Sequence, residues 1–401
     1  MINFVLALAS GGVTLILMPF YMLLVLTALA AWRGKAKTRA PAPRQAPLRF
    51  VLLIPAHNEA ELIAATVNSL LSLDYPGDRF EVLVIADNCS DQTAALAHQA
   101  GALVWERSHL TLRGKGHALE WAIQRLLHER QSTDLDAVVI IDADIGADKD
   151  LLWAFAAGRR AGYDFAQALY LGLNPEISWR TQLMNYALAL FNGTWLMAQE
   201  ELGMSVALRG NGMCFSVSGL KRCPWSTFGL AEDLEFSWRL RLNGERAHFV
   251  RAARINAQLV SKGGAAAASQ RQRWEHGRKA LRRLYTGELL RHRQLGYWRQ
   301  AYYFLDLYML PLSKLATWQL VATLVGLYLG MCGLGTVQAL MFVGMAGYAL
   351  TPFFVLGLPW RYLLALRFLP VYVLWKLWLY GQRAPRQWIR TGREGGASKE
   401  G

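Results

Sequence analysis

The chain has long apolar segments near both ends and short apolar runs in between. Residues 2–32 contain no charged side chain, and about twenty apolar residues are enough for a helix to cross a bilayer. Two more long apolar stretches lie at roughly 312–334 and 337–358, and we expect the uncharged GLGT at 333–336 to form the turn between them. The pattern therefore predicts three membrane helices, one before the central region and two after it.

The central region has the pattern of an α/β domain. Four continuous apolar runs have the length of strands: 50–55, 80–86, 102–106 and 137–141. Helical segments are expected between them, over 59–73, after Asp91 and after Gly114. Strands that alternate with helices form a parallel sheet covered on both faces. No G-x-G-x-x-G follows the first strand, so the dinucleotide-binding fingerprint is absent.

The basic residues gather next to the apolar segments. Six Lys or Arg side chains fall between Arg33 and Arg49, directly after the first apolar segment. The net charge of +14 is compatible with nucleic-acid binding, but this placement is the one expected at an anionic membrane surface. By the positive-inside rule, the first helix is an uncleaved anchor and the region after it is cytoplasmic. Four Cys and eight His show no ligand spacing, so neither a disulfide framework nor a zinc site is indicated.

A basic amphipathic helix is predicted after a flexible loop at 262–269. Trp274, Leu281, Leu284 and Tyr285 share one face of this helix, and Arg or Lys fill the others, as expected at a membrane surface. The last apolar segment, 362–380, is interrupted by basic residues. Because a cytoplasmic tail requires an even number of spans after the central domain, we expect this segment to lie on the membrane.

Five parts are therefore predicted along the chain. They are a membrane helix (1–33), a basic Pro-rich linker (34–48), a cytoplasmic α/β domain that ends in the amphipathic helix (49–300), two membrane helices (301–360), and an interfacial basic helix with a cytoplasmic tail (361–401).

Two carboxylates follow the fourth predicted strand. The sequence VVIIDAD places Asp142 and Asp144 one residue apart at the carboxyl end of that strand, which in a parallel α/β sheet faces the ligand crevice. Alternate residues of an extended segment point the same way, so both could meet one ligand. Neighbouring carboxylates repel each other and commonly indicate a compensating cation. A strand followed by a polar turn gives the same letters by chance.

The ends of the other strands also carry polar residues. PAHNE (55–59) follows the first strand and ADNCSDQT (86–93) the second, while Lys115 lies between two glycines just before a helix. Backbone N–H groups and an ammonium can bind a phosphate in such a place. Ordinary structural roles remain open: a first-turn Glu for Glu59, a helix-leading Asp for Asp87, an exposed turn for Lys115.

Three further segments follow the predicted parallel strands. The apolar stretch 178–202 is helical, and either belongs to the core or docks on the bilayer. LRGNGMCFS (208–216) is Gly-rich, so its backbone can approach a ligand closely. Glu232 and Asp233 stand in the first turn of a predicted helix, where capping and the helix dipole also favour acidic residues.

Taken together, these residues resemble the membrane-bound family 2 glycosyltransferases, which include cellulose, hyaluronan, chitin and poly-N-acetylglucosamine synthases. The resemblance covers about 50–285. It rests on PAHNE, the Asp after the second strand, D-x-D, the E-D pair and the Q-x-x-R-W at 270–274. It implies a GT-A fold, a Rossmann-like α/β domain for nucleotide sugars, on the cytoplasmic side of a multi-pass protein of the inner (plasma) membrane.

On the donor side, the resemblance implies a metal site and a nucleotide pocket. Asp144 would hold Mg²⁺ or Mn²⁺ on the diphosphate, while Asp142 would contact the ribose or the metal. Glu59 and Asp87 would line the nucleotide pocket, with Asp87 towards the base. Lys115 would meet the diphosphate.

On the acceptor side, the resemblance implies a base and a closing motif. Asp233 would be the general base that takes the proton from the acceptor hydroxyl, with inversion at the anomeric carbon. Glu232 would be a further substrate-binding residue. Gln270, Arg273 and Trp274 would close over the diphosphate and present an aromatic platform to the acceptor.

The function expected is transfer of a sugar, from a UDP-sugar first of all, to a lipid-linked or membrane-embedded acceptor. Three spans make a poor channel for a growing polymer, so a small processive β-glycan synthase would need an oligomer or an export partner. Such a synthase is the alternative prediction. A catalytically inert nucleotide-sugar scaffold would lack a base or a metal ligand, and none is missing. No nucleic-acid partner is expected, because the basic segments flank the membrane helices rather than the central domain.

Overall fold

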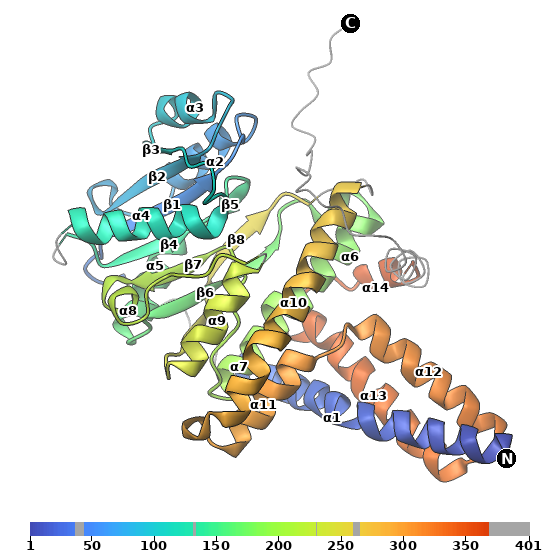
Figure 1. Cartoon of the computed structure of the whole chain (residues 1–401). Helices are drawn as coiled ribbons and strands as arrows, with labels where there is room; N and C mark the ends of the chain where they lie inside the picture. Colours follow the sequence, from blue (N-terminus) through green and yellow to red (C-terminus); the bar gives the residue numbers. More distant parts are fainter. Residues whose placement is uncertain (37–43, 131–133, 230, 260–264, 369–401) are drawn as a thin grey trace, which may run out of the picture.

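The computed structural model describes residues 1–36, 44–130, 134–229, 231–259 and 265–368, with the backbone alone for Ala36 and 265–276. An α/β part and a bundle of long helices make up the molecule, and the N-terminus lies at the end of the bundle farthest from the sheet (Figure 1).

One eight-stranded sheet forms the α/β part, in the order β3-β2-β1-β4-β7-β6-β8-β5. The strands are β1 (Phe50–Ala56), β2 (Phe80–Asp87), β3 (Leu103–Arg107), β4 (Ala137–Ile140), β5 (Ile145–Ala147), β6 (Phe165–Gly172), β7 (Met213–Ser216) and β8 (Ala247–Ala257). The four predicted strands pair in parallel, which confirms that half of the sheet.

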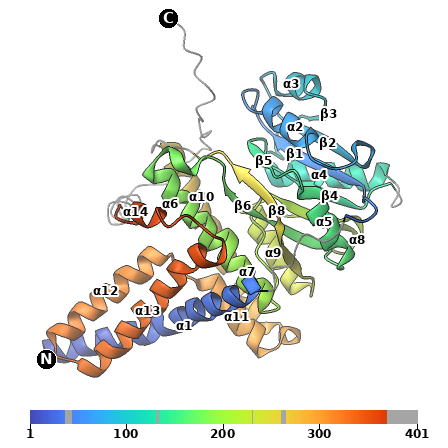
Figure 2. The ribbon, with the colours of Figure 1, turned by 180° about the vertical axis from the view of Figure 1, so that it is seen from behind.

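Alternate residues of β1 supply the two faces of the core. Val51 and Leu53 belong to the cluster beneath α4, whereas Leu52 and Ile54 belong to the cluster beneath α2 and α5, as the two-residue period of a strand requires. In Figure 1 α4 covers the near face, and Figure 2 shows α5 on the other. Burial on both faces is why these strands are apolar throughout.

The helices have the following bounds: α1 (Ile2–Ala36), α2 (Ile63–Leu71), α3 (Thr93–Gln99), α4 (Lys115–Glu129), α5 (Leu151–Arg160), α6 (Trp179–Leu188), α7 (Trp195–Glu201), α8 (Val217–Arg222), α9 (Glu232–Leu242), α10 (Ala265–Arg291), α11 (Tyr297–Tyr308), α12 (Leu312–Tyr328), α13 (Cys332–Val355) and α14 (Tyr362–Leu366). A π-helical segment, Ala189–Thr194, joins α6 to α7. Short 3₁₀ turns lie at Gly77–Arg79, Pro175–Ile177 and Arg293–Leu295.

Several predicted boundaries are wrong. α2 begins at Ile63 rather than at residue 59, because residues 60–62 form a turn first. α10 begins inside the loop predicted at 262–269. On α10, Leu281 and Tyr285 are buried, but Leu284 is 61% exposed, so the buried face follows a four-residue spacing that leaves Leu284 out.

Within the described part of the chain, two helices, α1 and α13, are long and apolar enough to cross a membrane. α12 meets this criterion only together with α11, and the two helices are bent by 88° relative to each other. The predicted turn at 333–336 is wrong, because those residues lie in the first turn of α13. The chain turns at residues 329–331 instead, where Gly330 (φ +64°) takes the left-handed conformation that ends α12.

Buried polar side chains join α1, α12 and α13. The Nε2 of Gln338 donates to the Oγ1 of Thr14 at 3.0 Å, and the Oγ of Ser10 donates to the carbonyl of Ala322 at 2.8 Å. Gln338 is fully buried. In an apolar bundle such hydrogen bonds fix which helix faces meet.

After α13 the chain returns to the α/β part. α14 packs against α6, and the side chains of Arg361 and Tyr362 both bond to Glu176, at 2.9 and 2.8 Å. Of the interfacial helix predicted within 361–401, only residues up to 368 are among those described.

Candidate active site

Lys115 is the centre of a charged cluster at the carboxyl edge of the parallel strands. Its Nζ lies 2.5 Å from Oδ1 of Asp142 and 4.0 Å from Oε1 of Glu232. It also donates to the carbonyl oxygen of Gly210 at 2.5 Å. Four parts of the fold therefore meet at this ammonium. They are the segment after β4, the loop before β7, and the first turns of α4 and α9.

The glycines around Lys115 have a steric cause. Gly114 has φ +107°, which a residue with a Cβ rarely adopts. A Cβ on Gly116 would lie 2.3 Å from the carbonyl oxygen of Thr227. The first turn of α4 therefore packs directly against the loop that leads into α9. The Gly-Lys-Gly sequence is thus a packing requirement that places Lys115 beside the acidic pair.

Asp233 is partly buried next to this ammonium. A Cβ added to Gly210 would lie 3.1 Å from Oδ2 of Asp233, so only a glycine leaves room for the carboxylate. Burial, and then the negative charge of Glu232, raise the pKa of Asp233 to about 7, while Lys115 and Arg209 act in the opposite direction. The N-cap of α9 is Ala231, without a side-chain cap, so the acidic pair does not cap its helix.

The Gly-rich loop 208–212 is held by a side chain that sequence reasoning missed. Gln167, fully buried on β6, accepts from the backbone N–H of Arg209 at 2.8 Å and donates to the carbonyl of Asn211 at 2.7 Å. The side-chain oxygen of Asn211 then accepts from the N–H of Asp142 at 3.2 Å. The one available signal was a lone Gln inside an otherwise apolar strand.

Arg209 is a second cation near Asp233, and sequence reasoning missed it. Its Nη2 donates to the carbonyl of Phe191, in the π-helical segment, at 2.8 Å. Burial and then the nearby Arg278 lower its pKa to about 10, and Asp306 and Asp233 oppose this. Arg209 therefore stays charged at neutral pH.

Asp142 and Asp144 do not continue one extended strand, contrary to expectation. β4 ends at Ile140, and residues 143–144 form a turn that Thr66 holds through the carbonyl of Ala143 at 2.7 Å. The side chain of Asp142 points to Lys115, and Asp144 lies two residues further on, in the turn before β5.

Asp87 stands at the carboxyl end of β2 in a buried ion pair. Its Oδ1 lies 2.5 Å from Nη1 of Arg107, and both side chains are less than 10% exposed. Asn88, with φ 52°, also donates to this oxygen at 2.9 Å. Glu59 is at the neighbouring end of β1, where its N–H donates to Thr93 at 2.8 Å. Both acidic residues thus line the edge that was predicted for them.

Replacing Asp87 by Asn should destabilise the protein by about 3–5 kcal/mol, because it leaves Arg107 buried without its partner. The control is Glu81→Gln, which breaks the half-exposed pair with Arg130 and should cost no more than about 1 kcal/mol. Thermal unfolding of the purified variants measures both. Equal melting temperatures would show that the buried pair is unimportant for stability.

Gln270, Arg273 and Trp274 lie on the first half of α10, where the side chains are outside the described residues. The backbone of α10 does pass close to the acidic pair, since a Cβ on Gly277 would lie 2.7 Å from the Cβ of Ala231. Among the described residues, no group of three His, Cys, Asp or Glu side chains could hold a metal ion.

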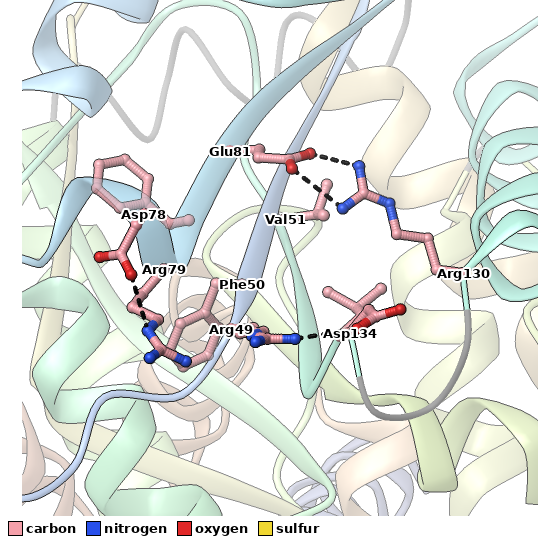
Figure 3. Close-up of a pocket in the computed structure, with 10 residues that line it drawn as sticks. Arg49, Phe50, Val51, Asp78, Arg79, Glu81, Arg130 and Asp134 are labelled. Atoms are coloured by element: carbon pink, nitrogen blue, oxygen red, sulfur yellow. Dashed lines mark hydrogen bonds and ion pairs between the residues drawn. The ribbon is translucent and has the colours of Figure 1, made fainter.

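A cavity of about 190 Å³ lies at the opposite edge of the sheet, where β1 and β2 begin. Its charged side chains are paired with each other, as Figure 3 shows: Arg49 with Asp134, Arg79 with Asp78, and Arg130 with Glu81. The cavity is therefore separate from the candidate active site.

A family model described as "Glycosyltransferase like family 2" matches residues 47–277, more than half of the chain. The chain belongs to this glycosyltransferase family. Its membership, together with the α/β sheet, confirms the predicted GT-A fold class. The matched region contains the whole charged cluster around Lys115 and the Q-x-x-R-W sequence.

Curated relatives of this glycosyltransferase include a beta-monoglucosyldiacylglycerol synthase of Synechocystis, 28% identical over 56% of this chain and 47% of that protein. A poly-beta-1,6-N-acetyl-D-glucosamine synthase of Staphylococcus epidermidis is 27% identical over 56% of this chain and 53% of that one. The chain spans about half the length of these relatives. Among solved structures, a mannosyltransferase of Pyrobaculum calidifontis has a TM-score of 0.49 and 19% identity, covering 84% of this chain and 98% of that one.

Proposed function

We propose that the protein is a metal-dependent, inverting glycosyltransferase. It transfers a sugar from a nucleoside diphosphate sugar, UDP-linked first of all, to a lipid-linked or membrane-embedded acceptor. The observation that carries this proposal is the placement of Asp233. A partly buried carboxylate with a pKa raised to about 7 lies beside Lys115 at the ligand-binding edge of a family 2 sheet. Such a carboxylate can accept a proton at neutral pH.

The donor side fits a hard divalent cation. Mg²⁺ commonly binds through one or two carboxylates together with substrate phosphates and water. Asp142 and Asp144 would be those carboxylates, and the ammonium of Lys115 at 2.5 Å shows that Asp142 accepts a positive charge. Bound Mg²⁺ or Mn²⁺ would neutralise negative charge on the diphosphate.

The protein's own residues account for the transfer. Lys115 binds a diphosphate oxygen, and Asp87 and Glu59 line the nucleotide pocket. Asp233 takes the proton of the acceptor hydroxyl as that oxygen bonds to the anomeric carbon. The bond from this carbon to the diphosphate breaks on the opposite face, and its electron pair leaves with the diphosphate. Burial, and then the charge of Glu232, keep the pKa of Asp233 high enough to hold the proton.

The pH dependence of kcat/KM should follow Asp233. Since a base must be deprotonated in the free enzyme, kcat/KM should rise with pH, with a midpoint of about 7, and level off above it. Arg209→Met should move this midpoint upward, because Arg209 lowers the pKa of Asp233. Initial rates between pH 5 and 9 test this. A flat profile over that range would contradict the assignment.

The helical bundle supports a membrane acceptor. α1 and α13 are candidate spans, and Arg33 and Lys35 at the end of α1 favour a cytoplasmic catalytic region in a multi-pass inner-membrane protein. Q-x-x-R-W residues Gln270, Arg273 and Trp274 would cover the diphosphate and the acceptor. One named relative makes a glucosylated diacylglycerol, which is a membrane lipid.

A processive β-glycan synthase is the second candidate, because another relative makes a β-1,6 polymer of N-acetylglucosamine. It would need an oligomer or an export partner. Incubating membranes with a panel of radiolabelled nucleotide sugars, with Mg²⁺, Mn²⁺ or EDTA, separates the two. We expect metal-dependent label in the lipid extract. Label in polymer favours the alternative, and no transfer from any donor refutes both.

A further inference from the structure

Asp306 lies on α11, beside the membrane helices, yet its carboxylate binds three donors from the catalytic region. The indole Nε1 of Trp195 donates to Oδ1 at 3.1 Å, and Gln199 donates to Oδ2 at 3.4 Å. Nη1 of Arg241 donates to Oδ2 at 3.1 Å. The side chains of Asp306 and Arg241 are 15% and 2% exposed, so this is a buried contact between α11, α7 and α9.

The guanidinium of Arg241 has one fixed place. It lies against the rings of Trp238 and Tyr303, 4.8 and 4.7 Å from their centres, and these two rings meet edge to face. Its Nη2 donates to the carbonyl of Ser205 at 3.1 Å, and the N–H of Ser205 donates to the hydroxyl of Tyr303 at 2.9 Å. Two rings, the Asp306 carboxylate and the Ser205 carbonyl thus hold the group, which leaves little freedom to the C-terminal half of α9.

Asp233 and Arg241 are on the same short helix, with Asp233 eight residues earlier. At about 1.5 Å of rise per residue, some 12 Å of helix separates them. Because an α-helix is stiff over that length, fixing α9 at Arg241 also fixes where the carboxylate of Asp233 stands.

α10, which carries the Q-x-x-R-W sequence, is tied to α11 as well. Nε of Arg282 donates to the carbonyl of Leu307 at 3.0 Å, near the end of α11. The hydroxyls of Thr286 and Tyr308 are 3.0 Å apart. In Figure 1 α10 and α11 lie side by side between the bundle and the sheet. α9 begins with the E-D pair, and α10 carries Q-x-x-R-W in its first half. The later turns of both helices are thus anchored to α11.

We propose that Asp306 is a positioning residue, which through Arg241 sets the place of α9 relative to the membrane helices. The proposal rests on the proposed function, in which Asp233 is the base. α11 turns by 88° into α12, and α12 packs against α1. Buried ion pairs add little stability compared with apolar pairs, but they can enforce one geometry. Asp306 therefore couples the arrangement of the bundle to the transfer step.

The test is the double variant Asp306→Leu/Arg241→Met in the full-length protein. Asp306→Asn alone would leave the charge of Arg241 buried without a carboxylate and could prevent folding, whereas the apolar pair avoids this. We expect kcat to fall about 10–100-fold, since a shift of about 1 Å at the reacting group has such an effect. The donor KM should stay within about twofold, because α4 and β4 are untouched.

Hydrogen–deuterium exchange provides a readout that does not depend on activity. Amides at the start of α9 should exchange at least about tenfold faster in the double variant, with those of α2 and α3 unchanged. The control is Asp134→Asn, which removes a carboxylate paired with Arg49 at 3.0 Å, at the edge of the sheet opposite the candidate active site. It should leave both kcat and α9 exchange unaltered.

The outcomes separate this proposal from the proposed function. If the double variant has wild-type kcat and wild-type exchange in α9, Asp306 has no positioning role. If Asp233→Asn keeps full turnover, the base assignment fails, and exchange in α9 still decides whether Asp306 fixes that helix.

Discussion

Asp233→Asn should lower kcat by about 10²–10⁴-fold, the usual contribution of a general base, while the nucleotide binds as before. Asn has almost the same shape as Asp, so it fits the space beside Gly210, where even a Cβ would come within 3.1 Å of the side chain. It cannot take the proton. Release of nucleoside diphosphate measures turnover, and calorimetry with UDP measures binding.

The matched control for this variant is Glu235→Gln. Glu235 lies in the same first turn of α9, but its carboxylate faces Gly229 rather than Lys115. Most of the activity should remain. Undiminished turnover in Asp233→Asn, with Glu235→Gln also active, would refute the assigned base.

Asp144→Asn should raise the metal concentration needed for half-maximal activity at least about tenfold, and lower kcat/KM by about 10²-fold. Loss of one of two carboxylates weakens the hold on a hard cation, and the leaving diphosphate is then less well neutralised. Activity across a Mg²⁺ series measures the first effect. Direct binding of Mn²⁺ in the presence of UDP provides a readout without turnover.

Asp148→Asn is the control for the metal site. Asp148 is four residues further along and accepts from the side chain of Asn256 at 2.9 Å, so its loss should leave metal dependence unchanged. If Asp144→Asn has the same metal requirement as Asp148→Asn, the metal assignment is wrong.

The parallel half of the sheet was predictable because its signals are local. Most of each strand there is an apolar run, and β1, β2 and β3 are each followed directly by a helix. The other half was not predicted. β7 has four residues and pairs with β4 across a long separation, Ala137 with Ser216, while β8 contains two arginines. Neither strand has a pattern that identifies it without its partners.

The candidate site was also predicted only in part. The strand-end rule brings Lys115 and Asp142 together correctly, because carboxyl ends of parallel strands share one edge. Glu232 was placed with them only by the family resemblance. Gln167 and Asn211 were missed. Their roles depend on hydrogen bonds between β6 and the loop before β7, and no spacing in the sequence records such contacts.

The buried contacts of α1 also order events during synthesis. The hydroxyl of Ser10 bonds to the carbonyl of Ala322, 312 residues later. At about 5–20 residues per second, roughly 15–60 s pass between the emergence of these two partners. Throughout that interval the nascent catalytic region folds while it is attached to α1 alone. The polar side chains of α1 have not yet met α12 and α13. Assembly of the bundle is therefore the last step. A chain released early would have a folded sheet but an incomplete helical bundle.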